Sequence, residues 1–333
     1  MIDPPPFSGD AALRARLAGK RVLVAGADGF LGTNCVRGLE ALGVPASVVS
    51  RRDRAPGSRA TGRHIRGDLM DPLVAEQAVA GHDIVFDLLG YPKLAPSSKA
   101  PQRELEQEFI PHVNLFQACS RSPARPLVFL CSSRLVYGTP QYLPVDEKHP
   151  VMPRSFYAAH KMLLEHYLGV MAKTDGLRNI VFRLSSPYGP FAPDRQASYG
   201  VLNMFMQMLM RGETVKLFGD GSQERDYVYV DDVIHAFLWS VVEPRCENET
   251  FNFGGDRAVS LAEAARSIAA IAGSGKIEHI PWPTVEKSQE TGSYRSDNRK
   301  LHSMTPLGQQ VPFDEGLRRT MNHLKSQKAG QSP

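Results

Sequence analysis

The sequence predicts an α/β fold in which a doubly wound parallel sheet is joined to a smaller, mixed α/β lobe. From residue 20 to residue 188, short apolar segments alternate with helical patterns, which is typical of parallel strands with helices on both faces. Beyond Tyr188 the alternation stops, and short segments of both types follow one another irregularly. At 333 residues the chain is long enough for two such units.

The composition is that of an ordinary globular protein, with 42% hydrophobic and 22% charged residues. The formal net charge of +4 is small for this length and the basic residues are scattered, so no nucleic-acid partner is expected. No apolar run approaches the roughly 18 residues that span a bilayer, and no signal segment opens the chain. We therefore expect a cytoplasmic protein with no membrane partner.

The four cysteines are far apart and form no C-x-x-C pair, so buried thiols are expected rather than disulfides or a zinc site. They are Cys35, Cys119, Cys131 and Cys246. The ten histidines show no metal-ligand spacing, and no metal is predicted.

Four parts of the chain are expected. Residues 1–19 form a mobile N-terminal segment that leads to a brief helix, and residues 20–188 form the domain with the parallel sheet. Residues 189–325 form mainly the smaller lobe, with segments that return to the first domain. Residues 326–333 are a polar, flexible tail.

A glycine-rich turn joins the first strand, residues 22–25, to the first helix. Its glycines are Gly26, Gly29 and Gly32, and apolar positions at helical spacing begin at Phe30 and Leu31. A strand that turns into a helix in this way directs backbone N–H groups and the positive helix end at one point, which suits a pyrophosphate. The spacing is G-x-x-G-x-x-G rather than the usual G-x-G-x-x-G. Its strand and helix context favours a dinucleotide site in a Rossmann-like domain over a plain structural turn.

The remaining elements follow in order. In the first part, strands are expected at 45–50, 63–66, 83–89, 127–131 and 179–184, with helices at 72–80, 102–120 and 155–173. In the second part, we expect a Met-rich helix at 201–210, a hairpin-like piece over 215–230, and helices at 231–242, 261–272 and 314–324. The methionines of the first of these helices are predicted to be core residues rather than a ligand surface.

Two stretches carry residues suited to catalysis. Ser132 and Ser133 follow the fifth strand, and ligands of open parallel sheets bind at the carboxyl ends of the strands. Tyr157 and Lys161 are four residues apart on a predicted helix and therefore share a face. A neighbouring ammonium favours ionisation of a phenol, so Lys161 could activate Tyr157 while it also binds a ribose. Ser133 would hold the substrate oxygen.

At this point the chain resembles the extended short-chain dehydrogenases/reductases of the nucleotide-sugar epimerase and dehydratase type. The resemblance runs from about residue 20 to residue 325. It rests on the ordered motifs GADGFLG at 26–32, GDL at 67–69, SSRLVYG at 132–138, YAAHK at 157–161 with Glu165 one turn later, RLSSPYGP at 183–190, GDGSQERDYVYVDDV at 219–233 and FNFGG at 251–255.

The resemblance implies site residues by position. Ser133, Tyr157 and Lys161 would be the catalytic trio. Arg225 would bind the substrate diphosphate, to which a planar guanidinium is suited, with a salt bridge to Asp226 or Glu224 as the alternative. The implied cofactor-binding residues are Gly26, Gly29, Phe30, Leu31, Gly32, Ser50, Arg51, Arg52, Asp68, Leu69, Leu89, Tyr157 and Lys161, and the further substrate-binding residues are Ser132, Arg134 and Ser186.

Departures from the family pattern narrow the reaction. In the dehydratases an acid pair follows the catalytic hydroxyl residue, because elimination of water needs its own proton donor and acceptor. Arg134 and Leu135 stand at these places, which argues against a 4,6-dehydratase and, at Leu135, against a decarboxylase. Ser186 stands where sugar epimerases often carry an asparagine, so the sugar preference stays open.

The end of the second strand bears on the cofactor. An NAD enzyme usually has an acid there for the ribose 2′-hydroxyl, whereas this chain has Ser50, Arg51 and Arg52. An arginine suits a 2′-phosphate, so NADP is favoured slightly over NAD.

Three functions remain open. The first is a nucleotide-sugar epimerase that works by reversible hydride transfer through a keto-sugar, and the second is an NADPH-dependent keto-sugar reductase. The third is a nucleotide-binding regulator without catalysis, against which the complete trio argues. The resemblance also implies a nucleotide-diphosphate sugar as substrate, and a homodimer formed through the helices at 102–120 and 155–173.

Overall fold

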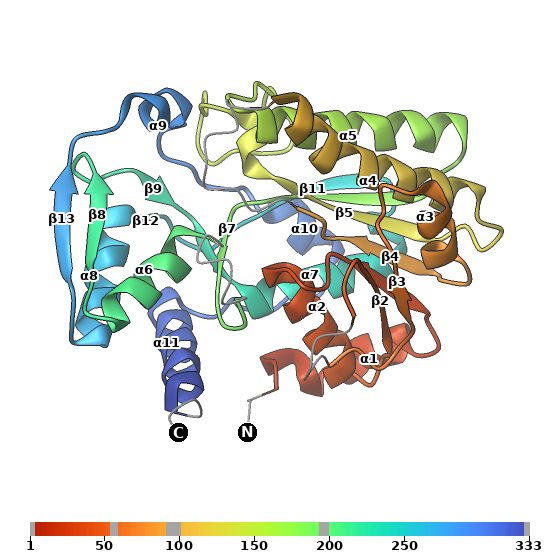
Figure 1. The fold of residues 1–333 in the computed structure, drawn as a ribbon, viewed down its shortest axis with the longest axis horizontal. Coiled ribbons are helices and arrows are strands. Elements are labelled where there is room, and N and C mark those ends of the chain that lie inside the picture. Colours follow the sequence, from red (N-terminus) through yellow and green to blue (C-terminus); the bar gives the residue numbers. More distant parts are fainter. Residues whose placement is uncertain (1–3, 54–58, 91–100, 193–199, 330–333) are drawn as a thin grey trace.

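The computed structural model describes residues 4–53, 59–90, 101–192 and 200–329, and a seven-stranded parallel sheet forms its larger part (Figure 1). Neighbouring strands of this sheet are parallel throughout. In spatial order the strands are β11 (Glu249–Phe253), β6 (Asn179–Leu184), β5 (Leu127–Ser133), β4 (Ile84–Asp87), β1 (Val22–Ala25), β2 (Ala46–Ser50) and β3 (His64–Arg66).

Helices cover both faces of the sheet, so the predicted doubly wound α/β fold is confirmed (Figure 1). Val22 and Val24 of β1 point to one hydrophobic core, and Leu23 and Ala25 point to the other, because successive side chains of a strand face opposite sides. The helices on the first face are α1 (Ala11–Leu17), α2 (Phe30–Ala41) and α7 (Val230–Val242). Those on the second face are α3 (Pro72–Val79), α4 (Pro101–Arg121) and α5 (Phe156–Thr174).

The strand order reverses between β1 and β4. From β1 the chain proceeds outward through β2 to β3, and it then returns to the other side of β1 and continues through β4, β5 and β6. A reversal of this kind opens a crevice at the carboxyl ends of the two central strands. The turns after β1 and β4, and the end of β5, therefore meet at one edge of the sheet.

The smaller lobe contains three two-stranded sheets, seen on the left of Figure 1. They pair β7 (Ser186–Tyr188) with β10 (Tyr227–Tyr229), β8 (Thr214–Phe218) with β13 (Lys276–Ile280), and β9 (Glu224–Arg225) with β12 (Val259–Ser260). The remaining helices are α6 (Val201–Met210), α8 (Leu261–Ala272), α9 (Thr284–Gln289), α10 (Arg299–Met304) and α11 (Phe313–Ala329). Short 3-10 turns occupy Pro6–Gly9, Arg134–Tyr137 and Pro244–Cys246.

The expected hairpin over 215–230 is wrong. β8 pairs in parallel with the distant β13, and β10 pairs in parallel with β7. Val215 and Leu217 of β8 are buried in the lobe core, so the pairing follows burial rather than proximity in the sequence. The strand β11 was not predicted either, and it extends the large sheet beyond β6.

Helices lie near both ends of the described chain, and α1 is the brief helix expected within residues 1–19. Asp10 caps α1 by accepting a hydrogen bond from Leu13 N, and Leu13 and Leu17 are fully buried where α1 packs on α7. At the other end, α11 continues to Ala329, past the expected start of the tail at residue 326. Residues 1–3 and 330–333 lie outside the described part of the chain.

The predicted core roles of the methionines and cysteines are confirmed. Met206 of α6 is fully buried, and Met204, Met208 and Met210 pack against the lobe core. All four cysteines are buried free thiols, and burial raises the pKa of each. Within the described ranges, no helix is both long and apolar enough to cross a membrane.

Candidate active site

The glycine loop after β1 is too tightly packed for larger residues. Gly26 has a φ of +82°, and a Cβ on it would lie 2.5 Å from the Leu88 carbonyl oxygen. A Cβ on Gly32, in the first turn of α2, would lie 2.0 Å from the Gly26 carbonyl oxygen. Gly29 occupies the N-cap position of α2. The loop thus brings backbone and the positive end of α2 close to the crevice, as a pyrophosphate site requires.

A cavity of about 340 Å³ adjoins this loop. Six of the residues that were predicted to bind the cofactor line it: Gly26, Ser50, Arg51, Asp68, Leu69 and Leu89. Gly29, Phe30, Leu31, Gly32 and Arg52 do not, and Phe30 is buried in the core instead. The cavity and the glycine cradle together fit a dinucleotide, whose pyrophosphate would lie at the loop.

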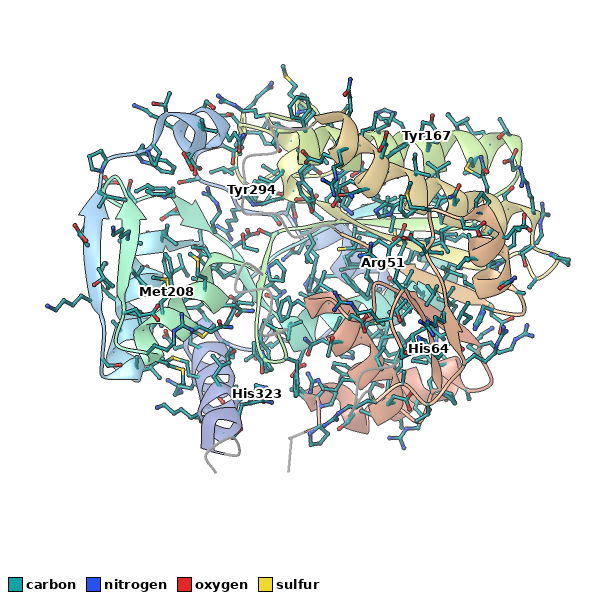
Figure 2. All side chains as sticks on the ribbon, in the orientation of Figure 1. Arg51, His64, Tyr167, Met208, Tyr294 and His323 are labelled. Carbon is teal, nitrogen blue, oxygen red and sulfur yellow. The ribbon has the colours of Figure 1, made fainter. Side chains whose placement is uncertain are left out.

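The end of β2 carries the exposed Arg51, which is labelled in Figure 2 and which lines this cavity. Arg51 Nη1 lies 3.9 Å from Asp68 Oδ2, and both side chains are largely exposed. Ser50 Oγ is held by Arg52 O at 2.8 Å and by His64 Nε2 at 3.0 Å. Arg51 is therefore an exposed arginine that lines the cavity, whereas Arg52 does not line it.

The predicted trio meets at the crevice. Ser133 is the last residue of β5, and its hydroxyl shares a hydrogen bond with the half-buried Tyr157 hydroxyl of α5. Lys161, one turn further along α5, is buried and donates from Nζ to Leu89 O at 3.3 Å. Leu89 also lines the dinucleotide cavity. The ammonium thus lies between the hydroxyls of Ser133 and Tyr157 and the cavity beside the glycine loop.

The pKa of Tyr157 is not lowered as the sequence analysis expected. Burial raises the pKa of Tyr157, and the nearby Lys161 and the hydrogen bond from Ser133 lower it less than burial raises it. Burial alone would lower the pKa of Lys161, but the charges of Tyr157, Asp87 and Glu108 raise it. The lysine therefore acts in the predicted direction, yet the phenol of the cofactor-free chain keeps its proton at neutral pH.

Acidic residues beside the trio were missed by the sequence reasoning. Asp87 ends β4, and its Oδ2 lies 2.6 Å from His112 Nδ1 of α4, with both side chains buried. Glu108 of α4 is buried too, and its Oε1 has no hydrogen-bond partner within the described residues. The position of Asp87 at the carboxyl end of a predicted strand was a usable signal. Whether Glu108 faces the site depends on how α4 is rotated about its axis, which the sequence leaves open.

Ser132 takes a structural contact. Its hydroxyl donates to Glu165 of α5, and Glu165 Oε2 lies 2.7 Å from Arg183 Nη2 of β6. Because this hydroxyl already donates its proton to Glu165, it is not free to donate to a substrate in this conformation. A substrate contact by Ser132 stays a prediction. Ser186 is half-buried in β7, where it pairs with Tyr227 of β10.

Arg225 forms an ion pair, but with neither of the expected acids. Its Nη2 lies 2.6 Å from Glu290 Oε1, and its Nη1 donates to Gly292 O at 2.6 Å and Glu224 O at 2.8 Å. Asp226 is turned away and fully buried, where it accepts hydrogen bonds from Ser185 Oγ and from Ser296 N. Burial raises the pKa of Asp226.

Arg134 turns toward the lobe. Its guanidinium lies 4.9 Å from the ring centre of Tyr294, which Figure 2 shows between the lobe and the large sheet. Its Nη1 donates to Thr291 Oγ1 at 3.3 Å. Neither contact could be read from the sequence, because Thr291 and Tyr294 belong to a loop far along the chain. In the described ranges, no group of three or more His, Cys, Asp or Glu side chains gathers as a metal site would.

Known proteins are similar to this chain in sequence. The model of the NAD dependent epimerase/dehydratase family matches residues 22–254. A UDP-glucose 4-epimerase of Mycolicibacterium smegmatis is 30% identical over 317 residues, which cover 92% of this chain and 99% of that protein.

Solved structures are similar as well. The UDP-glucose 4-epimerase of Thermotoga maritima with UDP-glucose is 26% identical with a TM-score of 0.83, and that of Thermus thermophilus with NAD is 27% identical with a TM-score of 0.80. Each comparison covers 92% of this chain and 99% of the other. The protein therefore belongs to the NAD dependent epimerase/dehydratase family, whose members are enzymes of the extended short-chain dehydrogenase/reductase type.

Proposed function

We propose that the protein is a nucleotide-sugar epimerase that acts on a nucleoside-diphosphate sugar. The observation that carries this proposal is the hydrogen-bonded Ser133 and Tyr157 pair, connected through Lys161 to the cavity beside the glycine loop. The similarity to UDP-glucose 4-epimerases over nearly the whole chain supports it.

In this proposal Ser133 holds the sugar oxygen and Tyr157 removes its proton, which it later returns. When bound, an oxidised nicotinamide dinucleotide would supply the hydride acceptor and a second positive charge that favours the phenolate. Lys161 compensates the phenolate from the other side and stays protonated, because carboxylates surround it. Gly26, Gly29 and Gly32 would accommodate the pyrophosphate.

The residues after Ser133 separate this reaction from dehydration. Elimination of water needs a proton donor and acceptor of its own beside the sugar. Arg134 occupies the first of these places with a guanidinium that cannot release its proton at neutral pH, and Leu135 occupies the second with a hydrocarbon. Epimerisation needs neither, because a single group can remove and return the same proton.

A product assay tests the proposal. Purified protein, supplied with a catalytic amount of NAD or NADP, is incubated with UDP-glucose, and the sugars are separated by chromatography after acid hydrolysis. We expect a second hexose to accumulate to an equilibrium ratio without net change in absorbance at 340 nm. Conversion of a keto-sugar only as NADPH is consumed in equal amount would contradict it.

That outcome would favour a second candidate, an NADPH-dependent keto-sugar reductase. Burial keeps the pKa of Tyr157 above its ordinary value, which suits a proton donor, and Arg51 suits a 2′-phosphate. Tightly bound NAD that does not exchange in the purified protein would exclude this candidate.

For the cofactor we propose a slight preference for NADP(H), based on Arg51 at the rim of the cavity. Arg51→Ala is expected to weaken NADPH binding about 10-fold, since a charge-assisted contact is lost, and to leave NADH binding within about 2-fold. Fluorescence titration measures both. Arg66→Ala is the matched control, because it removes an exposed arginine of the adjacent strand that does not line the cavity. Equal weakening of both cofactors by Arg51→Ala would refute the preference.

We also propose a homodimer formed through α4 and α5. Apolar side chains lie exposed along these helices, and Figure 2 shows one of them, Tyr167, on the outer side of α5. They are Leu105, Ile110, Tyr167 and Val170. Sedimentation velocity checks this, and a monomer at micromolar concentration would contradict it.

A further inference from the structure

Arg134 is a buried cation that has no counter-charge in direct contact among the described residues. It is only 8% exposed. Within the described residues it forms no ion pair, and its single hydrogen bond is the long one of 3.3 Å to Thr291 Oγ1. The face of the guanidinium lies over Tyr294. A guanidinium carries five N–H donors, so most donors of Arg134 have no protein partner among the described residues.

Three other arginines of comparable burial form ion pairs with carboxylates. Arg183 forms a two-pronged pair with Glu165, and Arg225 pairs with Glu290. Arg37 of α2 pairs with Asp231 of α7. The fold therefore provides carboxylates for its buried guanidinium groups, and Arg134 is the exception among these four.

An unpaired buried charge lowers the stability of the folded protein, and the residues around Arg134 disfavour its charged form further. Burial, together with repulsion by the neighbouring Arg225, lowers its pKa to about 10. Asp226, Tyr294 and Glu290 act in the opposite direction but do not compensate. A site of this kind gains more from a bound anion than an exposed arginine would, because the ligand replaces solvation that burial has already removed.

Arg134 is the residue after Ser133, the residue that holds the sugar oxygen in the proposed function. Its guanidinium is directed toward the smaller lobe, close enough to Arg225 for the two charges to repel each other. We propose, building on the nucleotide-sugar function above, that Arg134 binds a carboxylate on the sugar and that the preferred substrate is a nucleoside-diphosphate hexuronate. Thr291 and Tyr294 hold the guanidinium in position for that contact.

Sugar geometry favours the carboxylate over the diphosphate as its partner. If the oxygen held by Ser133 is on C4, the C6 carboxylate is attached to the adjacent ring carbon, whereas the diphosphate is attached to C1 across the ring. Arg225, oriented by Glu290 and Gly292, is available for the diphosphate. A planar guanidinium and a carboxylate match in shape and can form two parallel hydrogen bonds.

The test compares UDP-glucuronate with UDP-glucose, which differ only in a carboxylate against a hydroxymethyl group, and includes UDP alone. Isothermal titration of wild-type protein loaded with NAD or NADP is expected to show at least ~10-fold tighter binding of UDP-glucuronate. In Arg134→Met the ratio of the two dissociation constants should fall to about one. The variant should melt no lower than wild type, since a buried unpaired charge is replaced by a side chain of similar length.

Arg225→Met is the matched control, and it should weaken both sugar nucleotides and UDP alike. Equal binding of the two sugar nucleotides by wild type would overturn the inference, while epimerisation of UDP-glucose would still leave the proposed function standing. Parallel weakening of UDP by Arg134→Met would assign the guanidinium to the diphosphate, and lower melting would assign it to the fold. Either outcome rejects the inference.

Discussion

Tyr157→Phe is expected to reduce turnover of the sugar nucleotide by roughly 10²–10⁴-fold, the usual contribution of a proton-transferring group. The substitution removes the only atom that exchanges a proton with the sugar in the proposed mechanism. It also removes the hydrogen bond to Ser133. The aromatic ring is kept, so the packing of α5 against β5 should change little. Steady-state kinetics of product formation measure the effect.

Cofactor binding gives this experiment its control. Lys161 and the glycine loop are unchanged in Tyr157→Phe, so the dissociation constant of the dinucleotide should stay within about 3-fold of wild type, or about 0.7 kcal/mol. Tyr167→Phe on the outer side of the same helix removes an equivalent hydroxyl and should be fully active. Undiminished turnover by Tyr157→Phe would reject the assigned role. Absence of turnover in the wild type with every nucleotide sugar would restore the hypothesis of a regulator without catalysis.

Glu165→Gln is expected to lower the free energy of unfolding by about 3 kcal/mol, because it leaves the mostly buried Arg183 without its counter-charge. Arg183 also donates to the Tyr137 hydroxyl at 2.9 Å, and this hydroxyl donates to Asn252 Oδ1 at 2.7 Å. The network thus connects α5 and β6 with β11. It also includes β5, because Ser132 donates to Glu165. Urea denaturation followed by circular dichroism measures the change.

The chain offers a closely matched control for this effect. Arg178 and Glu247 form the same two-pronged contact, at 2.9 and 2.7 Å, but their side chains are partly exposed. Water compensates such a pair when it is broken, so Glu247→Gln should cost less than about 1 kcal/mol. Equal losses in the two variants would show that burial is not what makes the Glu165 contact strong.

The dinucleotide half of the site follows from local sequence. Gly26 has a positive φ, and Gly32 has no room for a Cβ. Both positions therefore require glycine, and both lie in one short strand-turn-helix segment, so the spacing of the glycines in the sequence indicates the turn. Tyr157 and Lys161 share a face because they are one helical turn apart. Ser133 could be placed beside them from the rule that ligands bind where parallel strands end.

The sugar half depends on contacts between distant segments. Arg225 pairs with Glu290, and Arg134 packs on Tyr294, through a loop that carries no periodic pattern. Nothing in the neighbouring sequence of Arg225 distinguishes Glu290 from the closer acids Glu224 and Asp226. The choice is made by burial, which turns Asp226 inward to Ser185 and Ser296.

By itself the sequence determined the doubly wound sheet, the family and the order of the proposed catalytic residues, because alternation, glycine spacing and helical periodicity are properties of short segments. Only the tertiary structure decided that β8 pairs with β13, that β11 completes the large sheet, and that Arg134 lies buried without a carboxylate partner in the described chain. These outcomes depend on which apolar surfaces are buried against each other. Segments from the whole chain compete for this burial, so the pattern within one short segment does not predict the result.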